Sequence, residues 1–140
     1  MNRTQSTALM FAAALALAAT VSAEDVKPAA TLPAAATKTG VTYATDMKPI
    51  FETSCVKCHS GDKPKAHLRM DSMAGVLKGT KQDKIIIPGD SASSLIIKAT
   101  AHLTKDPEGW MPPPHNRAGI KPLTSEQIGL IRAWIDQGAK

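Results

Sequence analysis

Apolar side chains recur at helical spacing in several stretches of the sequence. The clearest stripe lies near the C-terminus and has four members: Ile128, Ile131, Trp134 and Ile135. Because residues three or four apart share one face of a helix, this stripe predicts an amphipathic helix. Thr124 and Gln127 ahead of it have the spacing of a capping box, and Gly138 after it is suited to end the helix.

A shorter helix is predicted near the start of the patterned region. One face of it is formed by four residues: Met47, Ile50, Phe51 and Ser54. The pair Thr45-Asp46 offers a cap, and Pro49 is tolerated in a first turn. We therefore expect a helix that runs into Cys55.

Two weaker patterns predict further helices. Residues 68–78 favour a helix or turn with Asp71 as a possible cap. Residues 95–99 favour another helix, capped by Asp90 or Ser91.

The remaining segments predict irregular chain. The apolar run 85–87 is short and ends at a proline and a glycine, so we interpret it as a buried extended connector. Five prolines between residues 105 and 122 exclude regular helix and sheet there. The expected fold is all-α, a small helical domain with long loops.

The N-terminal residues 1–23 have the order of a secretory signal peptide. Arg3 precedes an alanine- and leucine-rich run, and the small residues of Val21-Ser22-Ala23 follow it. We expect cleavage after Ala23 and a periplasmic or otherwise exported protein. The apolar run is too short for a comfortable bilayer span of about 20 residues, so no stable membrane anchor is expected.

Composition shifts again after the predicted cleavage point. Residues 24–40 are rich in Ala, Pro and Thr and show no amphipathic period, which predicts a flexible tether outside the fold. The folded domain is then expected over residues 41–140.

Cys55-Val56-Lys57-Cys58-His59 is the attachment sequence of a c-type haem. This spacing lets two thiols form thioethers with the vinyl groups of a haem while the next imidazole reaches the iron. The motif therefore predicts haem attachment at Cys55 and Cys58 and an iron ligand at His59. A backbone carbonyl near Lys63-Pro64 is expected to accept a hydrogen bond from the other ring nitrogen of His59.

Three alternatives use the same cysteines. A thioredoxin-like dithiol would want a helix that starts at the motif, whereas a helix is expected to end there. A zinc site would need a second pair of closely spaced ligands, and a disulfide between Cys55 and Cys58 would close too small a loop to stabilise much. The export signal further favours haem.

Composition bears on the core and on partners. Removal of residues 1–23 leaves four aromatic residues, so a porphyrin would supply apolar surface that the side chains lack.

The same removal also lowers the net charge. It takes Arg3 from the 17 Lys and Arg residues, and the remaining 16 against 12 Asp and Glu give a net charge of +4. This modest excess does not predict nucleic-acid binding. Three lysines beside the motif could attract an acidic redox partner: Lys57, Lys63 and Lys65.

A second iron ligand is expected from the proline-rich loop. Three prolines follow Met111 directly, and a stiff loop lowers the entropy that a weak thioether ligand loses on binding. His115 and His102 remain alternatives. Trp110 is expected to cover a haem edge. His67 and His102, when not ligands, are expected at the surface, and the other helix-region methionines in the core.

Residues 46–139 as a whole resemble the planctomycete-type cytochrome c domain, a subgroup of the class I cytochrome c fold. The matching stretches are DMKPIFETSCVKCHS, LRMDSMAGVLKG, IIIPGDSASSLIIKA, MPPP and LTSEQIGLIRAWIDQGA. The resemblance implies a cytochrome c-like helical domain with one covalent haem c. It also implies axial ligation by His59 and Met111.

Together these observations predict an exported mono-haem cytochrome that carries single electrons between redox partner proteins, a monomer and not an enzyme. One alternative is a five-coordinate haem protein that binds small ligands or acts as a weak peroxidase. Another is a haem module of a larger exported complex.

Overall fold

The computed structural model describes residues 31–140, and the regular elements of this range are helices. The α-helices are α1 (Lys48–Ser54), α2 (Met73–Lys78), α3 (Leu95–Thr100) and α4 (Ser125–Asp136). A π-helical turn, Tyr43–Met47, leads into α1, and Lys65–His67 and Pro107–Gly109 are single 3₁₀ turns. No strand occurs in residues 31–140, which agrees with the predicted all-α class. The predicted signal peptide, residues 1–23, lies outside the described residues.

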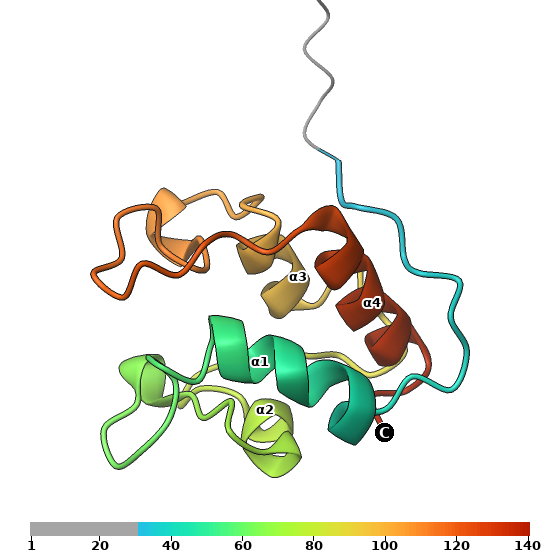
Figure 1. The fold of residues 1–140 in the computed structure, drawn as a ribbon, viewed down its shortest axis with the longest axis horizontal. Coiled ribbons are helices and arrows are strands. Elements are labelled where there is room, and N and C mark those ends of the chain that lie inside the picture. Colours follow the sequence, from blue (N-terminus) through green and yellow to red (C-terminus); the bar gives the residue numbers. More distant parts are fainter. Residues whose placement is uncertain (1–30) are drawn as a thin grey trace, which may run out of the picture.

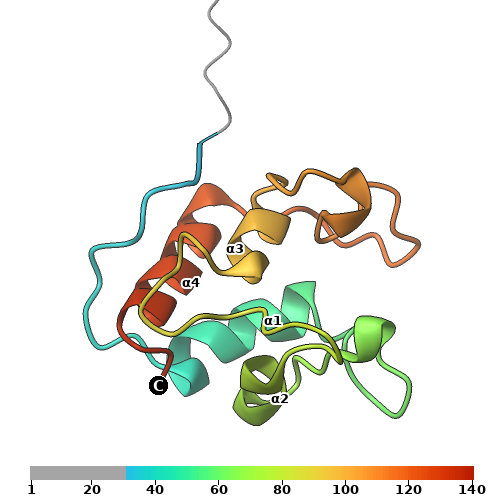
Figure 2. The same ribbon diagram turned by 180° about the vertical axis from the view of Figure 1, so that it is seen from behind.

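Helices α1, α3 and α4 contribute buried side chains to one hydrophobic core. Figure 1 shows α4 beside α3, with α1 below them and α2 below α1, and Figure 2 shows the same order from behind. The long segments after α1 and after α3 extend away from α4, whereas the segment between α2 and α3 contacts it through Gly89 and Ser91. Within the described part of the chain, no helix is long and apolar enough to cross a membrane.

Three aromatic rings form the centre of the core on the α4 side. Trp134 and Phe51 are fully buried, and their ring centroids lie 6.3 Å apart in an edge-to-face arrangement. Tyr43 lies about equally far from both rings, at 6.2 Å from Phe51 and 6.1 Å from Trp134. The indole N–H of Trp134 donates to the Lys140 carbonyl, so its one polar group is paired. Trp134 of α4 thus packs against Phe51 of α1.

The predicted start of α4 is confirmed in detail. The Thr124 hydroxyl accepts a hydrogen bond from the Gln127 N–H at 3.2 Å, and the Gln127 side chain accepts one from the Thr124 N–H at 2.9 Å. This reciprocal pair satisfies two backbone donors at the helix start. The four residues of the predicted stripe are buried: Ile128, Ile131, Trp134 and Ile135.

The other predicted caps are wrong. The helical segment before the cysteines is capped by Thr42 and not by Thr45 or Asp46. The Asp46 carboxylate instead accepts hydrogen bonds from the Thr42 N–H and from Lys38. α2 is capped by Ser72, since Asp71 pairs with a neighbouring arginine.

A separate turn explains the wrong cap of the next helix. α3 begins after Ser94, because the Asp90 carboxylate accepts from the Ser93 N–H and closes a turn before the helix. Ser91 is used elsewhere, where both its N–H and its hydroxyl donate to Asp136 of α4. The 85–87 run is neither helix nor strand, as expected of a connector. Ile85 and Ile86 are buried as predicted, whereas Ile87 is exposed.

Residues 31–40, which we call the strap, differ from the flexible tether predicted over residues 24–40. Residues 24–30 of that prediction lie outside the described residues. The strap lies along α4, with the Ala36 N–H donating to the Gly129 carbonyl at 2.9 Å. Arg132 donates to the Pro33 carbonyl, and the Gln137 side-chain amide donates to the Lys38 carbonyl. Leu32 and Ala36 pack against the core. The ordered part therefore begins before Val41, the expected boundary.

A glycine in α4 makes this close approach possible. A Cβ atom at Gly129 would lie 2.6 Å from the Ala34 carbonyl oxygen, closer than such atoms can approach. The strap backbone thus occupies the space that a side chain on α4 would fill.

Candidate functional site

The attachment motif lies at the C-terminal end of α1. The N–H of Cys55, which follows the last residue of α1, donates to the Phe51 carbonyl. The N–H groups of Cys58 and His59 both donate to the Cys55 carbonyl, at 3.1 and 3.0 Å. This tight turn brings Cys55, Cys58 and His59 to the wall of one cavity.

The cavity is lined mainly by apolar side chains and is open on one side. Its atom-free space, the mouth included, is about 960 Å³. Besides the motif, the lining residues come from four regions of the chain: Leu68 and Met70, Thr80 and Ile85, Leu95 to Thr100, and Gly109 to Leu123. Figure 1 shows the segment after α1 at the lower left and the segment after α3 at the upper left, and both segments contribute lining residues. A large flat apolar group fits such walls.

His59 is held in one orientation by its backbone surroundings. Its Nδ1 lies 3.1 Å from the Lys65 carbonyl oxygen, which can only accept, so Nδ1 carries the proton. Nε2 is then the nitrogen available to an iron. Burial lowers the pKa of His59, which keeps the ring neutral as a metal ligand must be. The predicted carbonyl partner near Lys63-Pro64 is present, one residue further on.

The loop that supplies this carbonyl has a constrained backbone. Ala66 and His67 both have left-handed φ angles, 54° and 53°. Such angles are uncommon for residues with a Cβ, and two in succession turn the chain sharply after Lys65. His67 is exposed, as predicted.

The thiol chemistry argues against a thioredoxin-like reading of the motif. Burial raises the pKa of Cys55 to about 12, with a smaller effect from Cys58. Redox-active dithiols need a thiolate with a lowered pKa, usually at a helix N-terminus, whereas Cys55 follows the end of α1. A zinc cluster also lacks support, because in the described residues no three His, Cys, Asp or Glu side chains converge as metal ligands do.

Met111 is the sulfur-bearing residue that the proline-rich loop brings to the cavity. Its N–H donates to the Ala99 carbonyl at the end of α3, at 3.0 Å. Met111, Pro112 and Pro113 all line the same cavity as His59. His115 is exposed and does not line it.

The neighbours of Met111 differ from the predictions. Trp110 does not line the cavity and instead stacks on His102, with ring centroids 4.9 Å apart and planes 4° from parallel. His102, predicted at the surface when it is not a ligand, has a buried Nε2 and is also absent from the cavity wall.

Two lining residues were missed by sequence reasoning. Asn116 holds the loop after the prolines, because its amide donates to the Pro113 and Ile120 carbonyls and its oxygen accepts from the Ile120 N–H. An asparagine among prolines and glycines is a turn signal that pointed to this role. Met70, expected only in the core, is 4% exposed and also lines the cavity.

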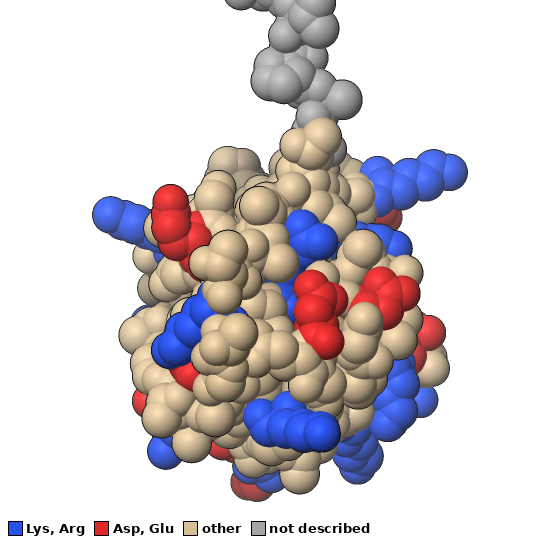
Figure 3. Space-filling model, turned by 90° about the vertical axis from the view of Figure 1, so that its right-hand side faces the viewer, with Lys and Arg blue, Asp and Glu red and all other residues tan. Residues whose placement is uncertain are grey.

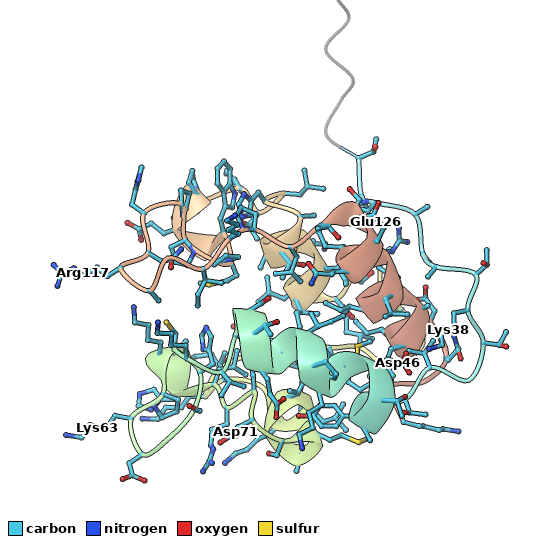
Figure 4. All side chains as sticks on the ribbon, in the orientation of Figure 1. Lys38, Asp46, Lys63, Asp71, Arg117 and Glu126 are labelled. Carbon is cyan, nitrogen blue, oxygen red and sulfur yellow. The ribbon has the colours of Figure 1, made fainter. Side chains whose placement is uncertain are left out.

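Cationic side chains extend from both loop segments that contribute residues to the cavity wall. Lys63, after α1, and Arg117, in the loop above, extend toward the same side of the molecule in Figure 4. Lys57 donates to the Ala118 carbonyl at 3.4 Å and so connects the two segments. The face that carries α4 and the strap differs, since Figure 3 shows cations and anions interspersed there.

An apolar cavity whose wall carries two cysteines and a histidine, spaced as C-x-x-C-H, defines a c-type haem domain. Residues 55–115 match the family model described as planctomycete cytochrome C. The chain therefore contains a planctomycete-type cytochrome c domain, which implies a covalently bound haem and haem-based electron transfer. No curated protein and no solved structure shows significant similarity to the chain.

Proposed function

We propose that the protein is an exported mono-haem c-type cytochrome that carries single electrons between redox proteins. The observation that carries the proposal is the shared cavity, with Cys55, Cys58 and His59 on one wall and Met111 on another. The sequence has one C-x-x-C-H motif, which uses both cysteines of the chain, and this favours one haem. Export rests on the signal-like residues 1–23.

Each residue has a defined task in this proposal. A bound haem supplies an iron that changes between the ferric and ferrous states by one electron. The sulfurs of Cys55 and Cys58 would hold the macrocycle covalently, and His59 Nε2 and the Met111 thioether would bind the iron. The Lys65 carbonyl fixes the His59 ring, which makes it a better donor to the metal.

The chemistry of the cavity wall supports electron transfer over substrate turnover. The lining residues include no Asp, Glu, Lys or Arg, so no charged acid or base faces the iron. An apolar wall also limits the change in solvation when the iron changes charge. We propose accordingly a cytochrome c-like fold and no catalytic residues.

The proposed partners are acidic redox proteins that meet the mouth of the cavity. Four cationic side chains are exposed on the two segments that contribute to the cavity wall: Lys57, Lys63, Lys65 and Arg117. Figure 4 shows Lys63 and Arg117 extending to the same side of the molecule. Opposite charge on a partner would speed its approach and orient it toward the haem edge. We propose that the protein works as a monomer without a membrane anchor, with its domain starting at the strap.

The test compares Met111→Ala with His115→Ala in the exported holoprotein. If Met111 is the second ligand, its substitution abolishes the long-wavelength sulfur-to-iron charge-transfer band and opens the reduced iron to carbon monoxide. The reduction potential also falls, because the thioether favours the ferrous state. His115→Ala should leave these properties unchanged.

A different result would favour the ligand-binding alternative. If the unsubstituted oxidised protein lacks the sulfur band and the reduced protein binds carbon monoxide, the iron is open. Loss of the native spectrum only in His115→Ala would show that His115 is the ligand.

A further inference from the structure

His102 occupies a backbone position that favours glycine. It follows the end of α3 with a left-handed φ of 56°. The Leu103 N–H donates to the Lys98 carbonyl at 2.8 Å, and the His102 N–H donates to the Ala99 carbonyl at 3.2 Å. This pair of bonds is the Schellman ending of a helix, in which the left-handed residue is usually glycine. A histidine here needs a reason beyond the backbone.

The hydrogen bonding of the ring does not give that reason. Nε2 of His102 is buried, and no group in the described residues hydrogen-bonds to it. A buried nitrogen without a partner disfavours the folded state. The interaction that the ring does make is the parallel stack on Trp110, at 4.9 Å between centroids.

The stack lies next to the candidate ligand. Trp110 is bonded directly to Met111, whose N–H donates to the same Ala99 carbonyl that accepts from His102. The end of α3 therefore holds this segment in two ways, by one backbone hydrogen bond to Met111 and by one ring contact to the preceding residue. The Trp110 indole N–H also donates to the Thr104 carbonyl, at 3.4 Å.

We propose that His102 is a positioning residue that holds Met111 over the cavity through Trp110. The proposal rests on the proposed function, in which Met111 is an iron ligand. A thioether is a weak ligand, so its bond depends on a loop that is already held in place. Without the stack, the end of α3 holds this segment by the Met111 backbone bond alone, and the sulfur leaves the iron more often.

The test replaces His102 by Gly in the exported holoprotein. Glycine suits the left-handed backbone, so the fold is retained while the stack is lost. We expect the sulfur-to-iron band to weaken and the apparent affinity of the reduced protein for carbon monoxide to rise about two- to tenfold. This is the factor by which a stacked aromatic pair typically shifts an equilibrium.

Two further variants separate the ring contact from the backbone. His102→Phe keeps a flat ring and should restore the band and the low carbon monoxide affinity. Ala139→Gly is the matched control, because Ala139 follows α4 with a left-handed φ of 54° and does not line the cavity. It should leave both measurements unchanged.

The outcomes distinguish this inference from the proposed function. If the unsubstituted protein shows no sulfur band, Met111 is not a ligand, and the inference fails together with that assignment. If the band is present and His102→Gly leaves it and the carbon monoxide affinity unchanged, the inference is wrong while the ligand assignment stands. A His102→Phe variant that behaves like His102→Gly would also overturn the inference.

Discussion

Substitution of Gly129 by Ala tests whether the strap is part of the folded domain. Inside a helix, this change normally stabilises a protein by about 1 kcal/mol, because alanine has the higher helix propensity. In this structure the new methyl group would lie 2.6 Å from the Ala34 carbonyl oxygen, which belongs to backbone and cannot simply rotate away. The strap must therefore move away from α4.

The size of the opposing effect follows from the contacts that the strap makes. Its displacement breaks the 2.9 Å bond from the Ala36 N–H to the Gly129 carbonyl, worth about 1 kcal/mol. It also breaks the bond from Arg132 to the Pro33 carbonyl, worth about 2 kcal/mol because the donor is charged. The two lost bonds lower the free energy of unfolding by about 3 kcal/mol, and the higher helix propensity of alanine returns about 1 kcal/mol. The net loss is about 2 kcal/mol.

The assay is equilibrium urea unfolding of the holoprotein, followed by far-ultraviolet circular dichroism. The control is the same substitution in a chain that lacks residues 31–36, where the carbonyl is absent and Gly129→Ala should stabilise by about 1 kcal/mol. The sign of the effect thus reverses between the two backgrounds. If Gly129→Ala stabilises the full chain as well, the strap does not pack on α4.

Two further predictions concern charge. Neutralising Lys57, Lys63 and Lys65 together should flatten the salt dependence of the association rate with an acidic redox protein, measured by stopped flow, and an unchanged slope would remove these lysines from the docking surface. Hydrogen bonding from Lys38, with help from the Thr42 N–H, lowers the pKa of Asp46 to about 2, below its unfolded value. The stability that this carboxylate contributes is therefore complete above about pH 4 and is lost as pH falls toward 2. Lys38→Met should shift the start of acid unfolding to higher pH, and an identical acid titration would contradict the assignment.

The parts of the fold that sequence could predict are those governed by local spacing. The α4 stripe, its capping box and the C-x-x-C-H motif each depend on residues within one or two helical turns. The predicted end of a helix at Cys55 also holds, since α1 ends at Ser54. The prediction of a helix cap failed where the side chain bonds to a residue far away in the sequence, as Ser91 does to Asp136.

The strap and the His102 stack could not be predicted from such patterns. The strap pairs through backbone groups and has no repeating face, so its Ala- and Pro-rich sequence resembles a linker. Gly129 was the available signal, because a glycine inside a predicted helix usually marks a close contact. His102 meets Trp110 across an irregular loop, where no periodicity relates the two residues.

The strap and the loops that line the cavity lie on opposite sides of the molecule. In Figure 1 the strap runs along the α4 side, while the loops that line the cavity, with Lys63 and Arg117, extend to the opposite side. The strap is held on its side of the molecule by hydrogen bonds to α4. A group attached to the strap itself would consequently lie on the side opposite the loops that line the cavity.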